Sequence, residues 1–193
     1  VQVHVDGFET AAKTDEGKYD FVCSNIPFGN IKVFDPDFFH SGDAVKKFST
    51  HAIHNYFFMK AMDQVREGGF VAFITSRGFM DSPSNDSIRE RLIKNARLVG
   101  AYRLPDGMFS DESGTEVGSD LIVLQKHLGY DASLDPESQA FCEAKKGFSS
   151  MGGDDYSDIT MNEYFWQGLL VDGGERYFIS TDIQKVSFFM TPV

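Results

Sequence analysis

The residues best suited to chemistry stand where a predicted strand ends, in the hexapeptide SNIPFG. Pro27 restricts its own φ and favours an extended Ile26. The Ile26 carbonyl and the Asn25 side-chain oxygen can therefore converge on one hydrogen-bond donor. Phe28 offers a flat apolar face for stacking, and the glycine after it lets a ligand approach the backbone. The alternative is an ordinary strand-to-loop turn, because Asn, Pro and Gly all favour turns.

Basic side chains elsewhere offer contacts for a phosphate group. Arg77 follows a second predicted strand, so it should stand at the same sheet edge as Asn25, where it could meet a phosphate. Lys46 and Lys47 belong to the middle of the chain, residues 44–103, which holds 10 basic and 5 acidic side chains. The alternatives are an exposed arginine at a strand end and a solvated helical face.

Asp81 and Asp106 stand near predicted strand ends, but their separation in sequence indicates no paired-carboxylate mechanism. Three histidines, His40, His51 and His54, are candidate metal ligands. His51 and His54 fall on a predicted aromatic-rich helix, and no acidic or cysteine partner has the usual spacing. We therefore predict no metal site. The sequence also lacks a phosphate-cradling glycine loop and a serine nucleophile elbow.

Strands and helices alternate up to about residue 127, which favours an α/β fold. Apolar runs predict a short opening strand in VQVHV and further strands in YDFVCSN, FVAFIT, LVGAYRL and LIVLQ. The run YDFVCSN is expected to be buried. Apolar residues recur at helical spacing from about Ala44 to Glu67, and the following glycine pair supplies a stop. A capping box of Ser87 and Glu90 should open another helix.

Composition bounds the class of protein. The 193 residues suffice to bury a core, and a formal charge of -11 argues against a general nucleic-acid coat protein. Two cysteines are too few for a disulfide framework, so a reducing, cytoplasmic setting is expected. Cys23 lies in an apolar run and is interpreted as a small buried hydrophobic residue. No apolar stretch approaches the roughly 20 residues that cross a bilayer, and the first residues lack signal-peptide features.

The motif Asn25-Ile26-Pro27-Phe28 resembles the active-site motif of amino-group methyltransferases that use S-adenosylmethionine, in which Asp, Asn or Ser precedes two prolines and an aromatic residue. Four sequence blocks are similar, in their order and spacing, to blocks of the large DNA adenine-N6 methylases that phage and conjugative elements carry. Methylases of this kind also belong to restriction-modification systems. The four blocks are YDFVCSNIPFG, HNYFFMKAMDQVREGGFVAFITSRGFMD, LVGAYRLPDGMF and GTEVGSDLIVLQK. The resemblance covers roughly residues 1–127. It implies a partial Rossmann-like methyltransferase sheet with helices on both faces.

The resemblance implies methyl transfer from S-adenosylmethionine to N6 of an adenine rotated out of duplex DNA. The Asn25 side chain and the Ile26 carbonyl would hold the amino hydrogens, and Phe28 would stack on the base. Isoleucine in place of the family's first proline keeps the main-chain acceptor and removes some rigidity. Catalysis would rest chiefly on positioning and electrostatics.

The resemblance also implies a cofactor contact at Asp6, Gly7 and Phe8, because the opening strand would correspond to the third strand of the family's sheet. The family's glycine-rich turn and ribose-binding acid should precede Val1, as should two strands that would lie beside YDFVCSN. We therefore expect a fragment without the N-terminal cofactor motif, inactive alone and binding S-adenosylmethionine weakly or not at all. Its partners would be the missing N-terminal segment of the same polypeptide and, in the full-length protein, DNA.

We predict three parts in the chain. Residues 1–128 would be the C-terminal part of a methyltransferase catalytic domain, residues 129–159 a polar connector, and residues 160–193 a small appendage with an aromatic segment and a hairpin. Two alternative functions stay open. One is methylation of protein glutamine or RNA bases, which suits the acidic chain; the other is a non-catalytic, methyltransferase-like binding module of a larger mobile-element protein.

Overall fold

The computed structural model describes residues 5–11, 15–27, 29, 31–104, 118–150 and 156–168. The strands in these ranges are β1 Tyr19–Asn25, β2 Val65–Ser76, β3 Ala96–Arg103, β4 Ser119–Lys126, β5 Ala144–Ser150 and β6 Tyr156–Asn162. The α-helices are α1 Pro36–Phe39, α2 Ala44–Ser49, α3 Ile53–Gln64, α4 Gly78–Asp81, α5 Asp86–Ile93, α7 Pro136–Cys142 and α8 Glu163–Gly168. Short 3-10 turns are η1 Phe8–Thr10, η3 Pro83–Asn85 and η4 Ala132–Leu134.

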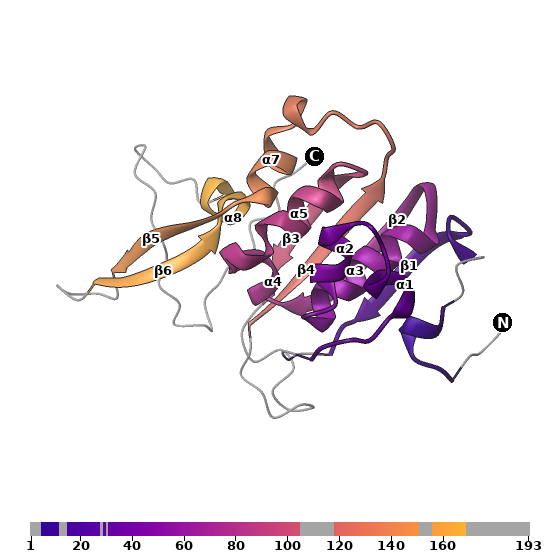
Figure 1. Cartoon of the computed structure of the whole chain (residues 1–193). Coiled ribbons are helices and arrows are strands. Elements are labelled where there is room, and N and C mark those ends of the chain that lie inside the picture. Colours follow the sequence, from indigo (N-terminus) through magenta and orange to yellow (C-terminus); the bar gives the residue numbers. More distant parts are fainter. Residues whose placement is uncertain are drawn as a thin grey trace.

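A mixed sheet forms the centre of the molecule, with the strand order β1-β2-β4-β3. β1 is parallel to β2, whereas β4 is antiparallel to both of its neighbours. β1 and β2 therefore end at the same edge of the sheet, which we call the carboxyl edge, and β4 begins there. β5 and β6 form a separate antiparallel ribbon that extends away from the sheet (Figure 1). This arrangement confirms the α/β class.

Helices cover one face of the sheet, where the core lies (Figure 1). Successive strand residues point to opposite faces. Val71 and Phe73 of β2 are fully buried under α3, whereas Ile74 is only half-buried. Phe73 lies edge-on to Phe58 of α3, with ring centroids 5.0 Å apart, and Phe58 stacks on Phe79 at 4.2 Å. These aromatic contacts join β2, α3 and α4 into one core.

The opposite face of the sheet, which we call the open face, is not covered by the described helices, a difference from the expected helices on both faces. Phe21 of β1 and Tyr102 of β3 are 55% and 47% exposed. Cys23 is also exposed. The predictions that β1 and Cys23 are buried are therefore wrong. Apolar sequence alone does not reveal that β1, which pairs only with β2 among the described strands, lies at a sheet edge.

The single helix predicted from about residue 44 is two helices. α2 ends at Ser49, and Thr50 donates its hydroxyl to the Lys47 carbonyl at 2.8 Å, a local bond that competes with helix continuation. α3 ends at Gln64, so the glycine pair lies inside β2 instead of stopping the helix. Gly69 is required there, because a Cβ would lie 2.8 Å from the Asp20 carbonyl oxygen of β1.

The predicted capping box is also wrong. α5 begins at Asp86, its N-cap is Asn85, and the cap has no side-chain hydrogen bond. Asn85 instead donates its side-chain amide to the Gly78 carbonyl at 3.0 Å. Ser87 lies within the helix. The preceding 3-10 turn, which the sequence spacing does not reveal, starts the helix two positions earlier.

The segment predicted as a polar connector contains regular structure. Asp135 caps α7 through the Glu137 amide, and Pro136 occupies the first helical turn, where its missing N–H costs nothing. Phe141 of α7 is buried, 6.4 Å from the ring of Phe79. The domain boundaries stay predictions. The hairpin expected after residue 168 and residues 1–4 of the opening strand lie outside the described residues; Val5 is described and is not in a strand.

Candidate active site

The predicted acceptor residues lie at the carboxyl edge of the sheet. Asn25 is the last residue of β1, pairs with Ile74 of β2 and is exposed. Strand alternation puts its side chain on the open face, together with Phe21. Ile26 continues the ladder, because its amide donates to the Ile74 carbonyl at 2.9 Å, and its side chain is buried. Asn25 is therefore held beside a fixed backbone segment and is accessible to a ligand.

The turn after this pair requires glycine. Pro27 and Gly29 are both exposed, and Gly29 has a φ of 136°. Side chains strain that backbone conformation, so glycine is the residue that allows the turn. Phe28, the expected stacking residue, lies outside the described residues.

Apolar side chains border Asn25 on the open face. Ile74 pairs with Leu121 of β4, and Leu121 pairs with Tyr102 of β3, so the residues form a row across the sheet. Ile74 and Leu121 are half-buried. Tyr102 stands three strand spacings from Asn25, about 14 Å away. Ile74 therefore offers the nearest apolar surface for a planar base. Sequence reasoning missed this row, because it depends on the strand order.

A charged cluster on the helical side also stands at the carboxyl edge. Arg103 of β3 donates to Asp120 of β4 at 2.9 Å and to Asp81 of α4 at 2.9 Å. The Asn162 amide donates to Asp81 at 3.1 Å, and the Arg103 guanidinium lies 4.3 Å from the Phe165 ring centroid. The cluster joins the sheet to the ribbon and to α8. No sequence motif signalled it.

Burial dominates the electrostatics of this cluster. Asp120 is fully buried, and burial raises its pKa to about 6, although Arg103 stabilises the ionised form. The neighbouring Asp81 carboxylate also raises the pKa of Asp120. Because two carboxylates face Arg103, the pKa of Arg103 lies above its usual value despite burial. Arg103 therefore keeps its proton, and Asp120 is the titrating member.

Arg77 lies at the carboxyl edge as predicted, directly after β2. Its amide donates to the Gly118 carbonyl at 2.9 Å, which fixes the start of β4. Its charge lowers the pKa of Asp120, so its side chain lies within electrostatic range of the charged cluster. The predicted contact with phosphate stays a prediction.

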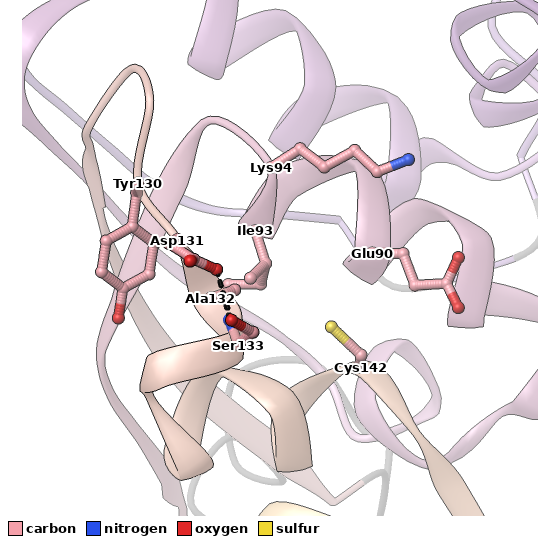
Figure 2. A pocket seen from close by; sticks show the side chains of 8 residues that line it. All are labelled: Glu90, Ile93, Lys94, Tyr130, Asp131, Ala132, Ser133 and Cys142. Atoms are coloured by element: carbon pink, nitrogen blue, oxygen red, sulfur yellow. Dashed lines mark hydrogen bonds between the residues drawn. The ribbon is translucent and has the colours of Figure 1, made fainter.

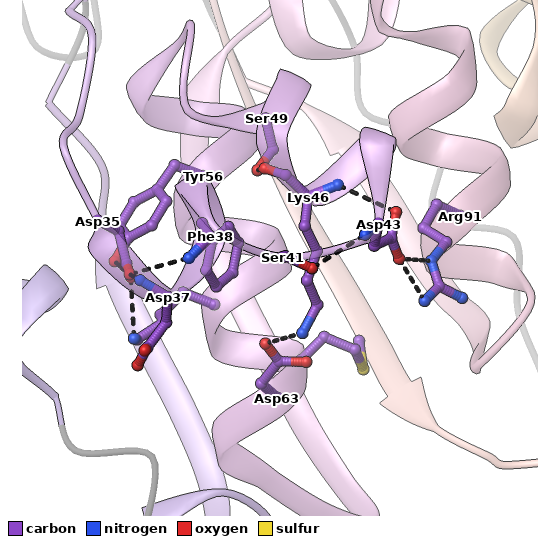
Figure 3. A network of polar contacts seen from close by, with 12 residues as sticks. Asp35, Asp37, Phe38, Ser41, Asp43, Lys46, Ser49, Tyr56, Asp63 and Arg91 are labelled. Carbon is purple, nitrogen blue, oxygen red and sulfur yellow. Dashed lines mark hydrogen bonds and ion pairs between the residues drawn. The ribbon is translucent and has the colours of Figure 1, made fainter.

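Lys46 and Lys47 lie elsewhere. The Lys46 ammonium pairs with Asp63 at 2.6 Å (Figure 3). Asp63 is near the end of α3, where β2 begins, and so lies at the sheet edge opposite the one that holds Asn25. Lys47 is exposed, with its ammonium 4.6 Å from the ring centroid of Phe39. The structure therefore does not bring Lys46 together with the Asn25 motif.

The predicted cofactor segment contacts α3. Asp6 and Gly7 are exposed, whereas Phe8 is half-buried, with its ring centroid 5.0 Å from that of Phe57 and 6.3 Å from that of Tyr56. Phe8 thus packs on the helix, and only part of its ring is accessible. These residues offer few polar atoms, and the sequence has no glycine-rich turn or ribose-binding acid of the family type.

A cavity of about 360 Å³ lies at the other end of the sheet (Figure 2). It is lined by α5 and by the segment after β4, including Ile93, Lys94, Tyr130 and Cys142. β4 leaves the sheet at Lys126, at the edge opposite Asn25, so this cavity does not belong to the candidate site.

The histidines supply no metal site within the described ranges, where no group of three or more His, Cys, Asp or Glu side chains could hold an ion. Burial lowers the pKa of His54 to about 4, and its ring lies 6.0 Å from that of Phe79. His54 is therefore a neutral core residue. In the part of the chain that the structure describes, no helix is long and apolar enough to cross a membrane.

The fold is similar to part of the fold of a restriction-enzyme modification protein. The M protein of the type I restriction enzyme EcoKI superposes with a TM-score of 0.50 at 18% identity, covering 63% of this chain and 23% of that protein. A modification subunit of a putative type I restriction enzyme from Vibrio vulnificus YJ016 is 21% identical, with a TM-score of 0.49, covering 62% of this chain and 25% of that one.

Sequence comparison gives the family. Residues 3–108 match the Eco57I restriction-modification methylase family, and the chain belongs to it. The Defense against restriction protein B of Escherichia phage P1 is 30% identical over 129 residues, which are 65% of this chain and 5% of that protein. The chain thus spans about one twentieth of the length of this curated relative.

Proposed function

We propose that the full-length protein transfers a methyl group from S-adenosylmethionine to the N6 amino group of an adenine in duplex DNA, and that this chain holds the adenine. One observation carries the proposal. In a chain of the methylase family, Asn25 stands exposed at the carboxyl end of β1, directly before the buried Ile26 and the rigid Pro27. Ligands bind at such strand ends in open α/β sheets.

The two acceptors suit an aromatic amine. The adenine amino group is a weak nucleophile because its lone pair is delocalised into the ring. The Asn25 side-chain oxygen and the Ile26 carbonyl oxygen would each accept one amino hydrogen and so favour the pyramidal geometry needed for attack. Both oxygens are neutral and are held at the end of β1, where Ile26 is bonded to β2, so little reorganisation is required in the transition state. The proton leaves the nitrogen after methyl transfer.

The base must leave the duplex to reach these acceptors. Phe28 would stack on its ring, a role that rests on the sequence motif. Ile74, beside Asn25 on the open face, would contact the ring edge. Arg77 would hold a backbone phosphate at the same sheet edge.

The cofactor supplies an electrophilic methyl group on its sulfonium sulfur when bound. We place most of its binding site in residues outside this chain, with Asp6, Gly7 and Phe8 contacting at most its adenine. The chain alone is therefore expected to bind S-adenosylmethionine weakly and to be inactive.

The part of the open face that Asn25 and Ile74 do not occupy is proposed as the contact with another segment of the same polypeptide. Phe21, Cys23 and Tyr102 are exposed on it, and exposed apolar surface of this kind usually marks an interface. Among the described strands β1 pairs only with β2, so its other edge can accept a further strand.

The test uses the full-length protein with tritium-labelled S-adenosylmethionine and duplex DNA. Asn25→Ala should lower kcat by about 100-fold or more, since one preorganised hydrogen-bond partner is lost. Asn25→Asp, which keeps an acceptor oxygen, should retain more activity. Ser24→Ala is the matched control, because Ser24 faces the helical side one position earlier. Unchanged activity of Asn25→Ala would remove the proposed role, and label found only on protein or RNA would favour a different substrate.

A further inference from the structure

A buried ion pair lies beneath the segment that follows the candidate active-site motif. Asp35 is 1% exposed and Lys60 of α3 is 3% exposed. The Lys60 ammonium donates to the Asp35 carboxylate at 3.0 Å, and the Tyr56 hydroxyl donates to the same oxygen at 2.7 Å. A buried pair of charges is weak evidence for stability, because desolvation offsets the attraction, but it defines geometry closely.

Asp35 connects two elements. Its other carboxylate oxygen accepts from the amides of Asp37 at 2.8 Å and Phe38 at 3.2 Å, which caps α1 (Figure 3). With both oxygens engaged, the hydrogen bonds lower the pKa of Asp35 although burial acts to raise it. The carboxylate thus ties the start of α1 to α3.

Among the described residues between the motif and α1, two backbone hydrogen bonds to other elements lie near the two ends of the segment. Ile26 is anchored to β2, and the Val33 amide donates to the Thr50 carbonyl at 2.9 Å, two residues before Asp35. Between these points Pro27 and Gly29 are exposed. The positions of Pro27 and Gly29 therefore depend on how firmly the far end of the segment is fixed.

Tyr56 links the same anchor to the N-terminal segment. Its ring is buried, with its centroid 5.1 Å from that of Phe38 and 6.3 Å from that of Phe8. Phe8 also contacts Phe57 of α3. One face of α3 therefore positions both the segment proposed to touch the cofactor and the segment proposed to hold the adenine.

We propose that Asp35, Tyr56 and Lys60 are positioning residues for methyl transfer. They fix the far end of the loop that begins at Asn25, and they set its place relative to Phe8. The inference rests on the proposed function. Misplacing a reacting group by about 1 Å can cost about 100-fold in rate, so an anchor remote from the chemistry can control kcat.

The test combines kinetics with local hydrogen exchange in the full-length protein. Lys60→Met keeps side-chain length and leaves the Asp35 carboxylate unpaired, whereas Asp35→Asn leaves the ammonium unpaired. The double variant, which combines Lys60→Met with Asp35→Asn, removes both charges together. Tyr56→Phe removes a single hydroxyl. Gln64→Met is the matched control, since Gln64 is a buried polar residue on the same helix at the far edge of the sheet.

We expect Lys60→Met to lower kcat on duplex DNA by about tenfold or more and to change the KM for S-adenosylmethionine by less than about threefold. Amide exchange should rise in residues 26–38 and stay unchanged in β3 and β4. The double variant should recover kcat to within about threefold of wild type, because no charge is left unpaired. Tyr56→Phe should show a smaller change of the same kind, and Gln64→Met should match wild type.

Three results would overturn the inference: wild-type exchange in residues 26–38 of Lys60→Met, a uniform rise in exchange over the whole chain, or an equal loss of kcat in Gln64→Met. If Lys60→Met does not fold, Tyr56→Phe and the double variant decide by the same criteria. The exchange measurement does not depend on the substrate. A wild-type protein that methylates no adenine but shows the local exchange response would refute the proposed function and leave the anchor supported.

Discussion

Asp120 should make the chain less stable at neutral pH than in mild acid. Burial raises the pKa of Asp120 from 3.8 to about 6 in the folded chain, and the carboxylate is fully buried. The folded state therefore holds this proton more tightly than the unfolded state does. Its contribution is most favourable below about pH 4, falls between about pH 4 and pH 6, and is constant above that range. At about 1.4 kcal/mol per pKa unit, the loss amounts to about 3 kcal/mol.

Urea unfolding followed by circular dichroism from pH 4 to pH 8 measures this effect. Asp120→Asn cannot titrate at this position, so the difference in unfolding free energy between wild type and variant isolates the carboxyl group. The variant should gain about 2 kcal/mol relative to wild type between pH 4 and pH 7, most of the full change. A difference that does not change with pH, or that changes in the opposite sense, would show that Arg103 keeps Asp120 ionised and would refute the reasoning.

Asp43→Asn is a control for which the pH dependence of stability should have the opposite sign to that of Asp120→Asn. Burial acts to raise the pKa of Asp43, but hydrogen bonds from the Lys46 amide and the Arg91 guanidinium outweigh it and lower the pKa. The stability that Asp43 supplies is therefore present above the unfolded-state pKa and is lost as the pH falls. Relative to Asp43→Asn, wild type should lose stability in acid.

Two substitutions test the packing, and a thiol-labelling experiment tests the exposure of β1. Phe58→Ala removes a fully buried ring from the aromatic core and should lower the unfolding free energy in urea by about 3–5 kcal/mol; a loss below about 1 kcal/mol would contradict that packing. Gly69→Ala forces a Cβ against the backbone of β1 and should cost about 1–3 kcal/mol, with faster amide exchange in β1; wild-type stability would show that the strands can separate there. Exposed Cys23 should react with a thiol reagent much faster than Cys142, because burial raises the pKa of Cys142 to about 11; the reverse order of rates would contradict the exposure of β1.

Local patterns predicted the elements that depend on neighbouring residues. The run YDFVCSN predicts β1 with the bounds that the structure has, Tyr19–Asn25, since its apolar core and the following turn residues are both local signals. The same signals placed Asn25 and Arg77 at one sheet edge, because parallel strands end on the same side.

Features that depend on strand order were missed. The edge position of β1, the exposure of Cys23 and the row from Asn25 to Tyr102 all follow from the order β1-β2-β4-β3, which spacing along the chain does not contain. The three charged side chains of the cluster around Arg103 come from three separate elements, β3, β4 and α4, so no motif reveals it. The sequence does not reveal the Asp35 anchor, because its lysine partner lies 25 residues away, on a helix whose spacing predicts an apolar interior side.

The central claim is that Asn25 and Ile26 hold an adenine for methylation at N6. The most direct measurement is mass spectrometry of nucleosides from duplex DNA incubated with the full-length protein and S-adenosylmethionine. N6-methyldeoxyadenosine should form with the wild-type protein and fall by about 100-fold with Asn25→Ala. Methylation confined to cytosine, or equal N6-methyldeoxyadenosine from both proteins, would contradict the claim.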